Sequence, residues 1–151
     1  MVKTEKSVEV NAPPEKVWEL LALDRMQEWM NDWKTIIFTS EVRTPEDKYR
    51  PGTSARVIEK WKDYDLEITE SLKNEKITYS SKGISGWPER WTRVAITLTY
   101  TLKPVKEGTE VTYQASCEGW LPARIFGDES IWKGQESLDN LKNSLERKTF
   151  S

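Results

Sequence analysis

Residues 8–21 read VEVNAPPEKVWELL and carry the change from strand to helix that sets the order of the elements. The residues before the prolines alternate in polarity, so residues 4–10 are expected to form a strand with Val8 and Val10 on one face. Asn11 is suited to be the N-cap, the prolines suit a first helical turn, and Glu15 favours the positive end of the helix dipole. The predicted helix places its apolar residues on one side, namely Val17, Trp18, Leu20 and Leu21.

Beyond this junction, strand patterns separated by short breaks lead to a final helix. A second short helical piece is predicted over residues 24–30. Six further strands are expected, at residues 35–43, 54–62, 64–72, 76–81, 91–103 and 110–119. The short breaks imply antiparallel hairpins, and residues 82–90 are expected to form a longer loop. Strands grouped together with helices at both ends predict an α+β fold and not a parallel α/β sheet.

The two longest predicted strands indicate which face of the sheet is buried. Their apolar faces carry Val94, Ile96, Leu98, Tyr100 and Leu102 in the first strand, and Val111, Tyr113, Ala115 and Cys117 in the second. The opposite faces are mostly threonine and other polar residues, which predicts a sheet covered on one side. The last third reads as a helix from residue 121, with an apolar stripe of Ile131, Gly134, Leu138, Leu141 and Leu145.

Length and charge limit the class of protein. The 151 residues are expected to form one domain, residues 1–151. The net charge of −2, from 23 basic and 25 acidic residues, predicts no nucleic-acid partner. The N-terminus has no apolar core of signal-peptide length, and no stretch approaches the ~20 apolar residues of an integral membrane segment. With Cys117 as its single cysteine, the chain is expected to be a soluble cytoplasmic protein.

The sequence contains no histidine. This absence removes the commonest general base near neutral pH and the commonest metal ligand. It excludes Ser-His-Asp and Cys-His catalysis and HExxH zinc sites. Catalysis by Cys117 is disfavoured because no histidine is present to activate the thiol. The carboxylates show no calcium-loop spacing, so we expect no metal and no cofactor.

The opening strand, the Ala12-Pro13 pair and the EKVW segment Glu15–Trp18 resemble the start of the START-like superfamily, also called SRPBCC or Bet v 1-like. That superfamily includes plant pollen-allergen proteins and the polyketide cyclase/dehydrase family. The segment Pro51–Thr53, the charged hairpins after it, the return Gly108–Thr112 and the final long helix also fit. The resemblance covers nearly the whole chain.

The resemblance implies a helix-grip fold. In this fold a seven-stranded curved antiparallel sheet, two short N-terminal helices and a long C-terminal helix enclose an apolar cavity. Members of the superfamily include lipid carriers, hormone receptors, cyclases, hydroxylase subunits and chaperone cofactors, so the fold does not assign an activity. This chain departs from the enzymatic members by lacking any histidine that they use as acid or base.

The sequence has a high content of aromatic residues, with eight Trp, five Tyr and three Phe. Ligand pockets are mainly apolar with a few orienting polar groups, whereas a core uses Trp and Tyr sparingly because each polar tip needs a partner. We expect a ligand site formed by Trp29, Trp33, Glu59, Trp61, Tyr79, Trp87, Trp91, Tyr113 and Trp132. The alternative for any single one of these residues is ordinary core packing.

The mouth and lid of this site are expected at particular residues. Trp29, Trp33 and Trp87 are placed near the mouth. The loop of residues 83–88 has two glycines for hinge freedom and apolar side chains that could close over a ligand, so it is the lid candidate. The alternative is an ordinary crossing loop.

Two carboxylates fall on strand faces that are predicted to be apolar. Glu59 lies between Val57 and Trp61, and Glu70 shares a face with Leu66 and Ile68. An inward carboxylate would need an arginine partner, or it would be neutralised and able to act as an acid or base. The alternative is a position near a strand end or on the wet face.

Three functions follow from this pattern. The first is binding of a small hydrophobic or aromatic ligand, lipid or polyketide-like, as a carrier or sensor. The second is a polyketide cyclase/dehydrase-type enzyme that positions a reactive chain and uses a cavity carboxylate or Tyr. The third is a protein-interaction module with an exposed aromatic patch from Trp29, Trp33 and Trp87. We expect the binding function over the enzyme, and the oligomeric state is open.

Overall fold

A computed structural model of the chain describes residues 2–29, 33–59, 62–82, 84–86, 94–119 and 134–150. Its elements in chain order are β1 (Val2–Val10), α1 (Pro14–Leu20), the 3-10 helix η1 (Leu23–Glu28), β2 (Trp33–Phe38), the 3-10 helix η2 (Pro45–Tyr49), β3 (Ser54–Glu59), β4 (Lys62–Leu72), β5 (Lys76–Lys82), β6 (Ile84–Gly86), β7 (Val94–Val105), β8 (Gly108–Gly119) and α3 (Gly134–Phe150). Within these ranges no helix is both long and apolar enough to cross a membrane.

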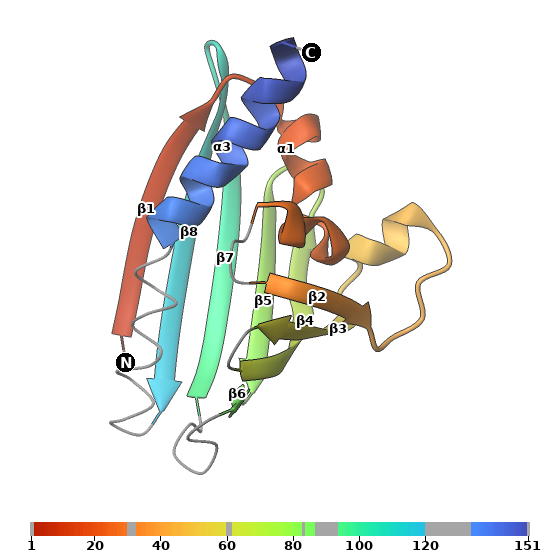
Figure 1. Ribbon diagram of the computed structural model, residues 1–151. Helices are drawn as coiled ribbons and strands as arrows, with labels where there is room; N and C mark the ends of the chain where they lie inside the picture. Colours follow the sequence, from red (N-terminus) through yellow and green to blue (C-terminus); the bar gives the residue numbers. More distant parts are fainter. Residues whose placement is uncertain are drawn as a thin grey trace.

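Seven strands pair in the order β1-β8-β7-β5-β4-β3-β2, and every pair is antiparallel. The short strand β6 pairs with the beginning of β4. Figure 1 shows the curved sheet with α3 lying across β1 and β8, and with α1 beside α3. A curved antiparallel sheet that wraps a C-terminal helix is the helix-grip arrangement, so the predicted α+β class is confirmed.

The inward face of the sheet is the one that the alternating pattern predicts. Inward side chains of β7 and β8 are buried, namely Ile96, Leu98, Tyr100, Leu102, Val111, Tyr113 and Ala115. Leu138, Leu141 and Leu145 of α3 are buried in the same apolar cluster, which confirms the predicted stripe over this part of the helix. Full burial of a leucine side chain stabilises the fold by roughly 1.5–3 kcal/mol, so these three residues anchor α3 to the sheet.

The junction between β1 and α1 differs from the prediction at its cap. The N-cap is Pro13, with no side-chain cap, and Asn11 is exposed outside the helix. Pro14 occupies the first turn, where a missing N–H costs nothing. A residue from another element stabilises the junction, because the Thr109 hydroxyl at the start of β8 donates to the Ala12 carbonyl oxygen at 2.7 Å.

The strand predicted over residues 35–43 is too long, because β2 ends at Phe38. The N–H groups of Thr39 and Ser40 still bind the Ser54 carbonyl oxygen, and after them polar side chains bind backbone N–H groups as the chain turns into η2. The Ser40 hydroxyl accepts from the Ser54 N–H at 3.0 Å, and the Asp47 carboxylate accepts from the N–H groups of Arg43 and Thr44 at 2.9 and 3.0 Å. Such side chains compete with a strand ladder for backbone groups, which alternation alone does not show.

Two predicted connections are also corrected. The expected loop over residues 82–90 is wrong for Lys82, which ends β5, and for Ile84–Gly86, which pair with residues 62–64 of β4. The expected connection over residues 104–109 is shorter, because β7 continues to Val105 and β8 begins at Gly108. Residues 87–90 and the predicted helical residues 121–133 lie outside the described ranges.

Candidate functional site

Three tyrosines form a continuous row across the inward face of β5, β7 and β8. Tyr100 and Tyr113 are direct partners in the β7–β8 ladder, and their ring centroids lie 5.2 Å apart. Tyr79 of β5 meets Tyr100 edge-on at 6.4 Å. Because Tyr79 and Tyr113 come from predicted site positions far apart in sequence, the sheet register is what brings them to one place.

Trp29 packs against Tyr100, the middle residue of this row, and is 1% exposed. Its ring stands at 90° to Tyr100 with centroids 5.7 Å apart. Its indole N–H donates to the Leu20 carbonyl oxygen at 2.8 Å, and its own carbonyl accepts from the Asn140 side chain of α3 at 3.2 Å. Trp29 therefore joins α1, the sheet and α3 inside the core, and the expected position near a pocket mouth is wrong.

The Tyr79 hydroxyl is used by the fold. It donates to the carbonyl oxygen of Leu21, directly after α1. Burial raises the pKa of Tyr79 well above its usual value, with smaller contributions from Tyr49 and Asp24. This phenol is a structural tie between β5 and the end of α1.

The Tyr113 hydroxyl differs from that of Tyr79. The residue is 4% exposed, and burial alone raises its pKa far above the ordinary value. No group among the described residues forms a hydrogen bond with this hydroxyl. The two phenols thus share the inward face of the sheet and a raised pKa, but of the two only the Tyr79 hydroxyl has a hydrogen-bond partner among the described residues.

Several apolar inward residues of β7 and β8 keep a little more accessible surface than Ile77 and Tyr79 on β5. Ile96 and Leu98 are each 8% exposed and Ala115 is 3% exposed. By contrast, Ile77 and Tyr79 on β5 are 0% exposed. Every described inward side chain of β5, β7 and β8 is uncharged. This surface suits contact with an apolar molecule and offers no acid–base pair.

The other predicted site residues are placed only in part. Trp33 and Glu59 are backbone partners across β2 and β3, and the directions of their side chains lie outside what the structure describes. The remaining members of the predicted set lie outside the described residues, namely Trp61, Trp87, Trp91 and Trp132. Tyr100 was not in the predicted set, although the alternation of residues 94–102 already placed it on the inward face.

Glu70 does not face the core. β4 contains a bulge, since Ile68 pairs with Tyr79 while Glu70 pairs with Thr78, and the extra residue is Thr69. A bulge reverses the alternation beyond it. Glu70 is therefore exposed, with its carboxylate 3.4 Å from the Lys76 ammonium, and the suggestion of an inward acid is wrong here. In the described part of the chain no three potential metal ligands gather.

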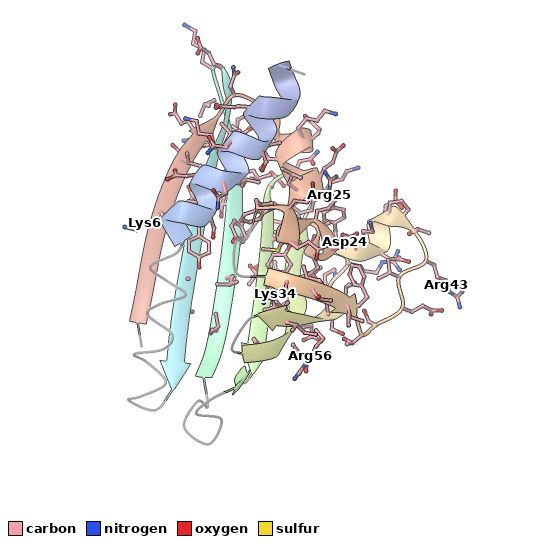
Figure 2. All side chains as sticks on the ribbon, in the orientation of Figure 1. Lys6, Asp24, Arg25, Lys34, Arg43 and Arg56 are labelled. Atoms are coloured by element: carbon pink, nitrogen blue, oxygen red, sulfur yellow. The ribbon has the colours of Figure 1, made fainter. Side chains whose placement is uncertain are left out.

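A second cluster lies where η2 packs against α1 and η1 (Figure 2). Trp18 stacks on Tyr49 with centroids 5.0 Å apart, and the Lys48 ammonium lies 2.8 Å from an Asp24 carboxylate oxygen. Burial, followed by the negative charges of Glu19 and Asp24, raises the pKa of Tyr49 to about 12. These contacts fasten the β2–β3 connection to the helices.

Comparison with known proteins adds a family to this geometry. The family described as polyketide cyclase / dehydrase and lipid transport matches residues 1–146. A search of curated proteins finds no match. Among solved structures, protein MLL2253 from Mesorhizobium loti gives a TM-score of 0.70 at 19% identity, over 97% of this chain and 98% of that chain. Ara h 8.0201 gives 0.70 at 13% identity, also over 97% and 98%. The Aha1 dimer from Colwellia psychrerythraea gives 0.66 at 20% identity, over 97% of each chain.

These solved structures agree with the helix-grip fold and, at such low identity, with nothing more specific. The match to the family covers nearly the whole chain and confirms the resemblance to the START-like superfamily. The chain belongs to the polyketide cyclase / dehydrase and lipid transport family.

Proposed function

We propose that the protein binds a small apolar or aromatic molecule in a cavity between the inward face of β7–β8 and α3, and acts as a carrier or sensor. One observation carries the proposal. Ile96, Leu98, Tyr113 and Ala115 face the core and are uncharged, yet they are 3–8% exposed, whereas Ile77 and Tyr79 on β5 are 0% exposed. Apolar walls with a few polar tips are the usual make-up of a ligand pocket.

The family description is consistent with this function, because it includes lipid transport. Trp33, Glu59, Trp61, Trp87, Trp91 and Trp132 stay predicted lining residues for the same cavity. The cyclase alternative has lost one of its two carboxylates, since Glu70 points to solvent. The interaction-module alternative has lost Trp29 from its exposed patch, since that ring is in the core.

A pair of matched substitutions tests whether the space exists. Ala115 and Ala55 are both inward strand residues. Ala115 is 3% exposed, whereas Ala55 is 0% exposed and lies in the core with the fully buried Val57 and Leu66. We expect Ala115→Leu to fold with nearly unchanged stability because it fills open volume. Ala55→Leu is expected to cost about 1–3 kcal/mol through overpacking.

Binding is measured on the same proteins. Native mass spectrometry of the freshly purified wild type should show a co-purifying small molecule, and a naphthalene-based fluorescent probe should bind the wild type and the Ala55→Leu variant. Ala115→Leu should bind the probe at least tenfold more weakly, a loss of ~1.4 kcal/mol. Equal destabilisation by both leucines, together with no probe binding by the wild type, would refute the proposed function.

A further inference from the structure

Two of the three buried tyrosines on the inward face, Tyr79 and Tyr113, differ in the hydrogen bonding of their hydroxyls. The Tyr79 hydroxyl is engaged by the Leu21 carbonyl oxygen. The Tyr113 hydroxyl forms no hydrogen bond with any described residue, and its oxygen is not fully buried. With no hydrogen-bond partner among the described residues, the hydroxyl of this inward residue, itself only 4% exposed, is free to bind a group on the inward side of the sheet.

The chemistry around Tyr113 selects the kind of group that it would bind. A phenol that stays protonated is a hydrogen-bond donor, and a buried donor without an acceptor is costly, so an acceptor on a ligand is favoured. The described inward side chains of β5, β7 and β8 are uncharged, and the burial that disfavours a phenolate at Tyr113 also disfavours a carboxylate beside it.

One cationic residue, Lys6, lies beside Tyr113 in the sheet, but its side chain is exposed at the edge of the sheet. Lys6 of β1 is the ladder partner of Tyr113, which places it on the same face of the sheet. Its side chain is exposed, and Figure 2 shows it at the free edge of β1. The ammonium group in water does not offset the cost of a buried carboxylate next to the phenol. The acceptor favoured at Tyr113 is therefore a neutral oxygen.

We propose that the ligand is an apolar molecule with a neutral carbonyl group, and that the Tyr113 hydroxyl orients it by donating a hydrogen bond to the carbonyl oxygen. This inference rests on the proposed binding function. Tyr113 acts here as a specificity-determining residue, because it distinguishes a carbonyl compound from a hydrocarbon of the same shape. Ile96, Leu98 and Ala115 supply the apolar contact that both molecules share.

The test compares two probes of similar shape on the full chain. One is a 6-acyl-2-dialkylaminonaphthalene dye, whose emission shifts to the red when its carbonyl accepts a hydrogen bond. The other is the matching 6-alkyl-2-dialkylaminonaphthalene, which lacks the carbonyl. We expect the wild type to bind the acyl dye about fivefold more tightly than the alkyl analogue, as one hydrogen bond supplies.

Tyr113→Phe and Tyr79→Phe are the matched variants. Tyr113→Phe should abolish the fivefold preference, leave the affinity for the alkyl analogue unchanged and shift the emission of the bound acyl dye to the blue. Tyr79→Phe should keep the preference and the red emission, because its hydroxyl is already bonded inside the fold.

Two negative results are distinguishable. If both probes bind and the preference is the same in all three proteins, or if the wild-type-bound dye emits as in an aprotic solvent, the assignment of Tyr113 is wrong and ligand binding stands. If neither probe binds the wild type, the proposed function fails and this inference fails with it.

Discussion

At the scale of single residues, Trp29 contacts α1, the sheet and α3 from inside the core. Its indole N–H reaches the end of α1, its ring meets Tyr100 on β7, and its carbonyl accepts from Asn140 on α3. Each contact uses a different part of the residue, so substitutions can separate them. The arrangement explains how a buried tryptophan satisfies its polar tip without a ligand.

We predict that Trp29→Phe lowers the free energy of unfolding by about 1–3 kcal/mol, because the Leu20 carbonyl loses its buried donor. Asn140→Ala should cost about 0.5–1.5 kcal/mol, since its hydrogen bond is only partly buried. Urea denaturation followed by circular dichroism measures both. Gln27→Ala, an exposed change on η1, is the control and should stay within about 0.5 kcal/mol of the wild type. A Trp29→Phe protein as stable as the control would contradict the role of the indole N–H.

At the scale of elements, the turn between β7 and β8 is docked onto the junction between β1 and α1. A Cβ atom added at Gly108 would lie 2.0 Å from the Val10 carbonyl oxygen and 3.1 Å from the Ala12 nitrogen. Backbone atoms cannot move aside as a flexible side chain does. The glycine is therefore required by a close approach of two backbones, and this approach fixes where α1 leaves the sheet.

We predict that Gly108→Ala destabilises the protein by about 3 kcal/mol or more, because the new methyl group forces β8 and the end of β1 apart. Gly52→Ala is the matched control. Gly52 has a φ of +95° but nothing within 4 Å of its added Cβ, so only backbone strain of about 1–2 kcal/mol is expected. Thermal unfolding of the two variants gives the comparison. Equal melting temperatures would show that the approach of Gly108 to Val10 carries no weight.

The elements also show which features the sequence can and cannot predict. The alternation in residues 94–102 and 111–115 places the correct side chains inward, and the leucine spacing of α3 is confirmed, because burial imposes these periods directly. The alternation alone left the direction of Glu70 open between the apolar and the wet face, because a one-residue bulge at Thr69 leaves no mark in a hydrophobic pattern. The sequence also does not predict that the Tyr79 hydroxyl is hydrogen-bonded and the Tyr113 hydroxyl is not, because this depends on where the Leu21 carbonyl lies in three dimensions.

At the scale of the whole molecule, tyrosine hydroxyls are buried in two separate places, to different degrees. Tyr79 and Tyr113 lie in the core between the sheet and the helices, and Tyr49 is half-buried where η2 packs on Trp18. All three have a pKa raised above the ordinary tyrosine value, chiefly by burial. The folded state therefore holds protons that the unfolded chain releases at high pH, and the stability of the entire fold is coupled to alkaline pH.

The direction of this coupling follows from the raised pKa values. Below about pH 10, the ordinary pKa of tyrosine, the phenols are protonated in both states and their contribution is fully present. Between about pH 10 and the folded-state values, only the unfolded chain ionises, so stability falls as pH rises. For Tyr49 the fall ends near its folded-state pKa of about 12, while for Tyr79 and Tyr113 it continues beyond.

We predict that the wild type unfolds cooperatively in alkali and that the phenolate absorbance of Tyr79 and Tyr113 appears together with the loss of far-ultraviolet circular dichroism. Tyr113→Phe removes one phenol that must ionise in the unfolded chain, so its alkaline midpoint should lie at higher pH than that of the wild type. Tyr79→Phe removes a phenol too, but it also leaves the Leu21 carbonyl without its donor, so it should be less stable near neutral pH. If all the tyrosines ionised near pH ~10 while the circular dichroism stayed native, the phenols would be open to water, and the buried row that defines the candidate site would not exist.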